Sequence, residues 1–290
     1  MNTMASDRYH LAGKTVWRVG YGAMQLAGDG VFGPPHDRGE AIAVLRAVID
    51  AGVNHIDIAQ YYGPGVVNEL VREALFPYPD DLALVSKVAA RRDESGAVLP
   101  HDEPEQLRAG IEDNLATLGL DPLTAVNLRV MDTALPDQRF VDQLAALATA
   151  RDEGLTAGIG ISNVTHRHLL TAIEVTEIVC VQDAYNLADR ASNPVLQECI
   201  ARGIAFVPFC PLGWPKKQHD AIRTNPVVID IAAGRGATAA RVALALAIAH
   251  NILLIPGTSS RRHLAENLAA EALSLHDDDI ASLDAAFGGL

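Results

Sequence analysis

The feature that most constrains the fold of this chain is a regular alternation of two hydrophobic patterns from residue 19 onward. Short apolar runs rich in β-branched residues alternate with longer segments whose apolar residues recur every three or four positions, which is typical of repeated strand–helix units. We predict parallel strands at 19–22, 55–57, 82–87, 125–129, 157–160, 179–182, 205–209 and 253–256. Helices are predicted between and after them at 38–51, 66–75, 104–118, 138–153, 165–175, 193–202, 237–250 and 261–270.

Residues that typically begin and end helices stand at the expected places. Pro104 falls in the first turn of its helix, where the missing N–H is not needed. Glycine takes the left-handed conformation of a helix cap at low cost. Four glycines stand where helices are predicted to end: Gly52, Gly119, Gly154 and Gly203. Residues 10–16 predict a β-hairpin able to plug the bottom of a barrel, and residues 277–287 predict one extra C-terminal helix.

Eight strand–helix units fit either a closed (β/α)8 TIM barrel or an open doubly wound sheet. The open sheet of dinucleotide-binding enzymes requires the pattern G-x-G-x-x-G after its first strand, and the segment Gly20-Tyr21-Gly22 lacks the third glycine. No linker or low-complexity segment divides the chain. We therefore predict an α/β protein with a single (β/α)8-barrel domain over residues 1–290.

The composition narrows the class of partner. The formal net charge is −13, and nucleic acids or anionic membranes are bound by clustered basic residues, so we expect neither as a partner and favour a small molecule. No apolar stretch reaches the roughly 18 residues that cross a bilayer, and the N-terminus lacks the pattern of a secretory signal. We expect a cytoplasmic protein without a metal site, whose Cys180, Cys199 and Cys210 are reduced core residues.

Three polar residues fall where a barrel places its active groups, at the carboxyl ends of strands. Asp57 ends the second strand, Tyr62 follows in the next loop, and Lys87 ends the third strand. A Lys ammonium held by an Asp carboxylate would stabilise a phenolate and lower the pKa of the tyrosine toward neutrality, which suits a general acid. The alternative is a structural ion pair beside an ordinary loop aromatic.

Motifs in the same order along nearly the whole chain resemble those of the aldo-keto reductase family. They are GYGAM at 20–24, GVNHIDIAQYYG at 52–63, LVSKV at 84–88, GIGISN at 158–163, VQDAYN at 181–186, PFCPLG at 208–213, and IPGTSS at 255–260 followed by Glu266 and Asn267. The resemblance implies that Asp57, Tyr62 and Lys87 are catalytic, with Tyr62 as proton donor to the substrate carbonyl.

One position departs from the family pattern. The family has a catalytic histidine at the end of the fourth strand, where this chain has Arg129. A guanidinium stays charged and can stabilise a developing alkoxide, so we assign Arg129 to the catalytic set. Two alternatives stay open: Arg129 pairs with Asp132 and only shapes the pocket, or the alignment slips and Asn127 points inward.

The resemblance also implies NADPH as cofactor. Ser162, Asn163 and Gln182 would hold its carboxamide, and Phe209 would stack on the nicotinamide in place of the family's more frequent tyrosine. Alternatively, Ser162 and Asn163 cap a helix and Phe209 is core. The remaining residues assigned to the cofactor are Gly22, Pro211, Leu212, Gly213, Lys217, Gly257, Thr258, Ser259, Arg262, His263, Glu266 and Asn267.

Basic residues near two predicted loops support binding of phosphate. Lys217 closes the loop after the seventh strand, and Arg261 and Arg262 begin the helix that follows the eighth strand, whose N-terminus favours an anion. A solvated basic helix start is the alternative. The family often has Lys at the position of Gly257 and Arg at that of His263, which weakens the argument for phosphate binding.

Within the family, segments 20–28, 31–35, 126–131 and 252–260 are especially similar to bacterial pyridoxal reductases. This similarity implies reduction of a small aldehyde, with pyridoxal to pyridoxine as the specific hypothesis. Met24, Phe32 and Trp214 are assigned to the substrate pocket. Alternatively, the aromatic rings of Phe32 and Trp214 only seal loops. The alternative functions are a broad-specificity carbonyl reductase and a non-catalytic NADPH-binding sensor subunit.

Overall fold

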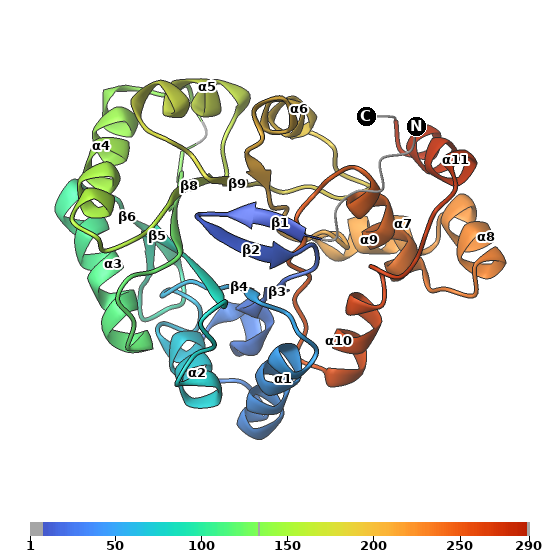
Figure 1. Cartoon of the computed structure of the whole chain (residues 1–290), viewed down its shortest axis with the longest axis horizontal. Helices are drawn as coiled ribbons and strands as arrows, with labels where there is room; N and C mark the ends of the chain where they lie inside the picture. The colour runs from blue at the N-terminus through green and yellow to red at the C-terminus, as the bar shows by residue number, and fades with distance from the viewer. Residues whose placement is uncertain (1–7, 133, 289–290) are drawn as a thin grey trace.

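Parallel strands arranged in a ring form the centre of the computed structural model, which describes residues 8–132 and 134–288 (Figure 1). The order around the ring is β3 (Tyr21–Gly22), β4 (His55–Asp57), β5 (Ala83–Arg92), β7 (Ala125–Arg129), β8 (Ile159–Ser162), β9 (Cys180–Gln182) and β10 (Ala205–Phe206). The start of the N-terminal segment considered for a secretory signal, residues 1–7, lies outside the described residues.

The eighth predicted strand closes the ring. Leu253 donates its amide to Phe206 of β10 at 3.1 Å, and on its other side Leu254 donates to the carbonyl of Arg18 at 2.9 Å and accepts from Gly20 at 2.8 Å. These bonds join the last segment to both neighbours, so the predicted α/β TIM barrel is confirmed and the open doubly wound sheet is wrong.

The strand predicted at 19–22 is regular only as β3 (Tyr21–Gly22), and the last two predicted strands end early for a common reason. The strand predicted at 205–209 ends as β10 at Phe206, and the one predicted at 253–256 is reduced to a single bridge between Leu254 and Val19. Pro208 and Pro256 lack the N–H that continues a ladder of hydrogen bonds. Proline therefore limits regular pairing here without opening the ring.

The predicted hairpin is present and lies across the centre of the ring (Figure 1). It consists of β1 (Arg8–Leu11) and β2 (Lys14–Trp17), joined by Ala12 and Gly13 with φ of 47° and 79°. Two positive φ values are what a tight hairpin turn requires. Leu11 and Val16 are fully buried against apolar residues at the starts of the barrel strands, so the hairpin plugs the amino-terminal end of the barrel.

Helices surround the ring, with most boundaries within two residues of the prediction. They are α1 (Arg38–Asp50), α2 (Val66–Leu75), α3 (Pro104–Leu118), α4 (Gln138–Asp152), α5 (His166–Val175), α6 (Asn193–Arg202), α7 (Lys216–Arg223), α8 (Pro226–Gly234), α9 (Ala239–Ala249), α10 (Arg261–Leu268) and α11 (Asp277–Ala286). The four predicted cap glycines all have positive φ, and α11 is the predicted extra helix. Helices α7 and α8 were not predicted; with α9 and α11 they bury a second apolar cluster around Val228 and Leu246.

A further unpredicted feature extends the sheet beyond the barrel. Strand β5 continues past Lys87 to Arg92 and pairs in antiparallel fashion with β6 (Val98–His101). The switch from parallel pairing with β7 to antiparallel pairing with β6 occurs after Val88, and Ala89 has a φ of 80°. The β5–β6 hairpin therefore stands on the carboxyl-end rim, where the barrel opens.

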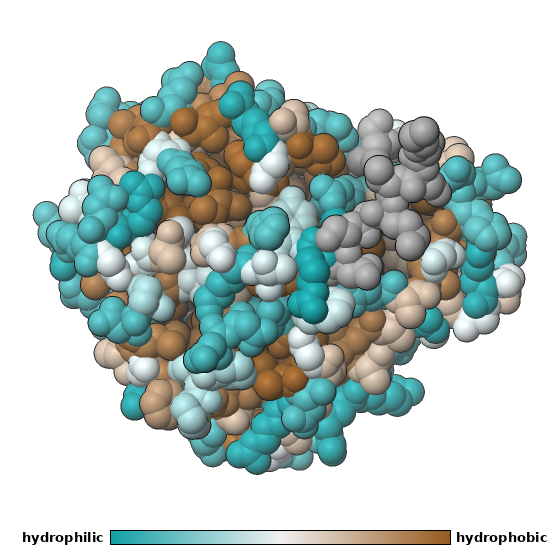
Figure 2. All heavy atoms as spheres, in the orientation of Figure 1, coloured by the Kyte–Doolittle hydropathy of each residue, from teal (hydrophilic) through white to brown (hydrophobic). Residues whose placement is uncertain are grey.

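The outer surface alternates in polarity. On the face that carries the β1–β2 hairpin, hydrophilic residues cover the outer helices and hydrophobic residues show between them (Figure 2). Among the described residues, no single helix combines the length and the apolar character needed to cross a bilayer; α8 and α9 pass such a test only together, across a bend of 92°.

Candidate active site

A buried ion pair lies at the carboxyl ends of β4 and β5. The Nζ atom of Lys87 is 2.5 Å from Oδ1 of Asp57, and each side chain is 5% exposed. Lys87 also donates to the carbonyl of Ile58 at 3.1 Å, and Nε2 of Gln182 donates to Oδ2 of Asp57 at 2.6 Å. Both carboxylate oxygens are thus engaged, so the ammonium is held in one position.

Tyr62 stands beside this ion pair, in the loop that follows β4. Its ring centroid is 5.1 Å from Nζ of Lys87, and its backbone N–H bonds to Ala59 at 3.0 Å. The neighbouring Tyr61 meets it edge to face, with ring centroids 5.2 Å apart. The predicted group of Asp57, Tyr62 and Lys87 is therefore brought together by the fold.

The expected lowering of the Tyr62 pKa is wrong. Burial raises the pKa of the Tyr62 phenol well above its ordinary value, and the nearby charge of Asp57 adds to the rise; the charges of Arg129 and Arg92 oppose it. The ammonium of Lys87 is engaged by Asp57, which explains why its charge does not dominate at the phenol. At neutral pH the phenol carries its proton, as a proton donor must.

Arg129 ends β7 in register with Ser162 of β8, which is in turn paired with Gln182 of β9. Its guanidinium donates to the sulfur of Met131 and lines the cavity that also contains Tyr62. Among residues 8–132 and 134–288 it makes no ion pair, so the predicted alternative of pairing with Asp132 is not seen.

Asn127 also faces the barrel interior, because it is two residues from Arg129 on the same strand. It is fully buried, and its Oδ1 accepts from Sγ of Cys180 at 3.3 Å. Asn127 therefore lies one layer deeper than the reacting end of the barrel, and Arg129 occupies the position at the rim.

The catalytic candidates open into a cavity of about 510 Å³, a volume suited to a small organic ligand. Among its walls are the predicted residues Met24, Tyr62, Lys87, Arg129, Ser162, Asn163, Phe209, Trp214 and Ser259. Sequence reasoning missed Gln25, His36, Tyr61, Arg92, Val98 and Cys210 in the same walls.

Cys210, predicted as core, is half-buried at this wall; Cys180 and Cys199 are buried as expected, and all three thiols are free. Phe32 lies outside the walls, with its ring against Gly96, so its loop-sealing alternative fits better.

A second cavity, of about 400 Å³, lies beside the first. It is lined by the predicted residues Leu212, Gly257, Thr258, His263, Glu266 and Asn267 and by the unpredicted His219, Ile222, Arg223 and Thr238. Gly257 and Thr258 line this cavity while the next residue, Ser259, lines the first. The chain thus places the two cavities on either side of one short segment, an arrangement that suits a dinucleotide.

Other residues assigned to the cofactor lie outside both cavities. Gly22 packs against the last strand, where a Cβ would meet the carbonyl of Ile255 at 2.6 Å. Pro211 lines a separate, small hollow, and Gly213 has a φ of 97° beside the start of α7. Lys217 and Arg262 are exposed on α7 and α10; Arg262 bonds to His263, and the preceding Arg261 pairs with Glu40 at 3.0 Å.

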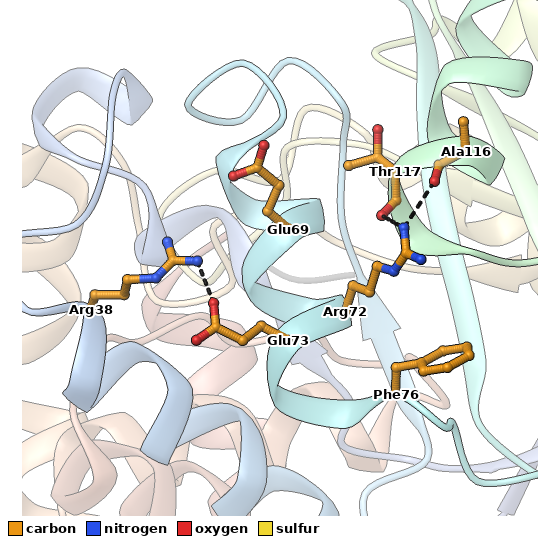
Figure 3. A pocket seen from close by; sticks show the side chains of 7 residues that line it. All are labelled: Arg38, Glu69, Arg72, Glu73, Phe76, Ala116 and Thr117. Carbon is orange, nitrogen blue, oxygen red and sulfur yellow. Dashed lines mark hydrogen bonds and ion pairs between the residues drawn. The ribbon is translucent and has the colours of Figure 1, made fainter.

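A third, wider hollow of about 800 Å³ lies away from these groups, against α1, α2 and the end of α3 (Figure 3). Its two arginines are already engaged: Arg38 pairs with Glu73, and Arg72 donates to the carbonyls of Ala116 and Thr117. It is broad and shallow, and it has no side chains converging on a reacting atom, so we do not consider it a catalytic site. Within the described residues, no cluster of three His, Cys, Asp or Glu side chains is placed to hold a metal ion.

The barrel, its plugging hairpin and the Asp57–Lys87–Tyr62 group define an aldo-keto reductase, and the family profile of aldo/keto reductases matches residues 18–287. The chain belongs to the aldo/keto reductase family and is an oxidoreductase.

The chain is 48% identical over 286 residues to pyridoxine 4-dehydrogenase of Escherichia coli K12, covering 97% of this chain and 98% of the relative. Solved structures give the same picture of the fold. A thermostable aldo-keto reductase bound to the inhibitor epalrestat is 28% identical with a TM-score of 0.82, covering 96% of this chain and 99% of that one. An aldo-keto reductase of Klebsiella pneumoniae in complex with NADPH is 25% identical with a TM-score of 0.83, covering 99% and 97%.

Proposed function

We propose that this chain uses NADPH to reduce a small aldehyde to an alcohol, with pyridoxal to pyridoxine as the specific reaction. The observation that carries the proposal is the placement of Tyr62 beside a fixed Lys87 ammonium in the wall of a cavity of about 510 Å³. The 48% identity to a pyridoxine 4-dehydrogenase supports the choice of substrate.

The residues present fit the dinucleotide. The fully buried Oε1 of Gln182 has no hydrogen-bond partner, although Nε2 of the same amide is held by Asp57. A buried acceptor without a donor is costly, and a carboxamide N–H₂ of the nicotinamide would satisfy it. Ser162, Asn163 and Phe209 would hold the nicotinamide end, and the walls of the second cavity would hold the adenosine end. NADPH in the similar Klebsiella structure supports this choice of cofactor.

When bound, NADPH supplies the hydride that reaches the carbonyl carbon. Tyr62 donates its phenolic proton to the carbonyl oxygen, and the positive charge of Arg129, which opposes the rise in the pKa of the phenol, stabilises the phenolate that is left. Arg129 stabilises negative charge on the oxygen while the proton is transferred. Met24 and Trp214 would offer apolar contacts to a flat ring in this cavity.

Replacing the proton donor tests this assignment. Tyr62→Phe removes the donated proton and leaves the ring, so we expect kcat/KM for pyridoxal to fall by roughly 10²- to 10⁴-fold, the usual contribution of general acid catalysis. Tyr61→Phe is the matched control, because Tyr61 lines the same cavity and is equally buried. Equal activity in wild type and Tyr62→Phe, with NADPH fluorescence quenched in both, would refute the role of Tyr62.

Comparison of substrates tests the specific reaction. A kcat/KM for pyridoxal no higher than for benzaldehyde or butanal would favour the broad-specificity carbonyl reductase. The sensor-subunit alternative predicts NADPH binding without turnover of any aldehyde; the assembly of Asp57, Tyr62 and Lys87 at one site argues against it.

A further inference from the structure

Arg92 lies in the wall of the substrate cavity, and the reaction proposed above gives it no step of its own beyond the effect of its charge on the pKa of Tyr62. It is the last residue of β5, five positions after Lys87. In a regular strand, residues an odd number of positions apart point to opposite faces. Ala89, between them, has a φ of 80°, which an L-residue adopts only at a cost and which changes the direction of the strand. As a result both Lys87 and Arg92 line the same cavity.

The guanidinium of Arg92 is held firmly by neutral groups. Its Nε donates to the carbonyl of Tyr61 at 3.1 Å, and its Nη1 donates to the carbonyl of Gly96 at 2.6 Å. No carboxylate within the described ranges forms an ion pair with it. The positive charge is therefore positioned but not neutralised, and its remaining N–H groups are available to a ligand in the cavity.

The charges around the cavity do not balance. Lys87 is neutralised by Asp57, and the wall carboxylate Asp29 lies 3.0 Å from His36 at the exposed rim. The guanidiniums of Arg92 and Arg129 remain without a carboxylate partner in the described part of the chain. Two guanidiniums without carboxylate partners, against the single exposed carboxylate of Asp29, leave the cavity wall positively charged, which favours an anionic ligand.

We propose that Arg92 is a specificity-determining residue that binds an anionic oxygen on the aldehyde substrate, at a point separate from the reacting carbonyl. The proposal rests on the proposed function and narrows its substrate class to aldehydes with an ionised oxygen. Pyridoxal belongs to this class, because its ring hydroxyl beside the aldehyde ionises below neutral pH. Arg129 binds the reacting oxygen and Arg92 binds the second oxygen.

The test compares an anionic aldehyde with a neutral one of similar shape. In wild type we expect a higher kcat/KM for 2-carboxybenzaldehyde, whose carboxylate stands beside the aldehyde as the ring oxygen of pyridoxal does, than for its methyl ester, methyl 2-formylbenzoate. Arg92→Gln should lower kcat/KM for the carboxylate and for pyridoxal by about ten- to a hundred-fold, the usual value of a hydrogen bond to a charged group. Activity on the methyl ester should change by less than about three-fold.

Arg91→Gln is the matched control, because this substitution removes the same charge from the neighbouring position of β5. Arg91 is exposed and lies outside the cavity. The substitution should leave the preference for the carboxylate unchanged. Arg92→Lys keeps the charge and should keep part of that preference, which also decides the question if Arg92→Gln fails to fold. Pyridoxal, which has only the ring oxygen, and pyridoxal 5′-phosphate, which has both anions, separate the two sources of negative charge, and pyridine-4-carbaldehyde, which has neither, is the neutral control. A loss on pyridoxal 5′-phosphate without a loss on pyridoxal would place the phosphate, and not the ring oxygen, on Arg92.

The failures are distinguishable. Equal losses on the carboxylate and the ester in Arg92→Gln, or no preference in wild type, would overturn the role of Arg92 and leave the proposed reduction intact. Absence of turnover of both compounds and of pyridoxal by wild type would overturn the proposed function and this inference with it.

Discussion

The buried pair of Asp57 and Lys87 allows stability and catalysis to be separated in one experiment. Each side chain is 5% exposed, so solvent screens their interaction little. Lys87→Met removes the ammonium and leaves the Asp57 carboxylate buried, which typically costs 3–5 kcal/mol. Because Gln182 still donates to Oδ2 of Asp57, we expect the lower end of this range, about 3 kcal/mol.

The double variant Asp57→Asn/Lys87→Met should be more stable than Lys87→Met. An asparagine keeps an acceptor for Gln182 and removes the uncompensated charge, so we expect about 2 kcal/mol of the loss to be recovered. Aldehyde reduction should stay lost in both variants. Urea unfolding followed by circular dichroism gives the free energies, with the exposed Lys217→Met as control, expected within about 0.5 kcal/mol of wild type. Wild-type stability in Lys87→Met, or no recovery in the double variant, would refute the description of this pair.

Two further predictions concern the barrel interior. Burial, with help from the charge of Lys87, lowers the pKa of His55 to about 4, while Asp57 opposes the change. As the pH falls, the unfolded state therefore binds the proton first, and the stability present above pH 6.5 is lost toward pH 4, by about 3 kcal/mol for a shift of this size. Urea unfolding at several pH values should show this slope in wild type but not in His55→Phe. The same dependence of stability on pH in the two proteins would contradict the prediction. In Gly160→Ala the added Cβ would meet Oδ1 of Asn127 at 2.0 Å and Sγ of Cys180 at 2.6 Å, so thermal unfolding should show a loss of stability of about 2 kcal/mol or more. The control Gly234→Ala has open space around the added Cβ and should be close to neutral. Equal stability of the two variants would be inconsistent with this packing.

Repeated strands and helices were predictable because each buries one face with a regular period. The missed helix α7 has a single buried residue, Ile222, and only Ala221 besides it is apolar, so no apolar residues recur along the helix. Helix α8 was missed for the opposite reason: its apolar residues lie in an almost continuous run, which shows no helical period. Strand β6 contains Pro100 and has no buried residue to mark an inner face. The single domain over residues 1–290 stays a prediction.

The catalytic candidates could be located because barrels place active groups at strand ends. The reverse holds for Arg92, which enters the cavity through the unusual backbone of Ala89, and for Arg223, which depends on the unpredicted α7. The pKa of Tyr62 was mispredicted because the sequence indicates which charges are near but not how deeply the phenol is buried. The positions of the reacting groups were therefore predictable from the sequence, whereas their burial and the charges around them depend on three-dimensional packing.

The β1–β2 hairpin has a practical consequence for handling the protein. It fills the amino-terminal end of the barrel, opposite the strand ends that carry Asp57 and Lys87. Aldehyde, alcohol and dinucleotide therefore all enter and leave at the carboxyl end of the barrel. The substitution Thr15→Cys, at an exposed position of β2, would thus provide a suitable attachment point for a dye or a tether. An enzyme immobilised through that side chain would keep the opening of its active-site cavity facing the bulk solution.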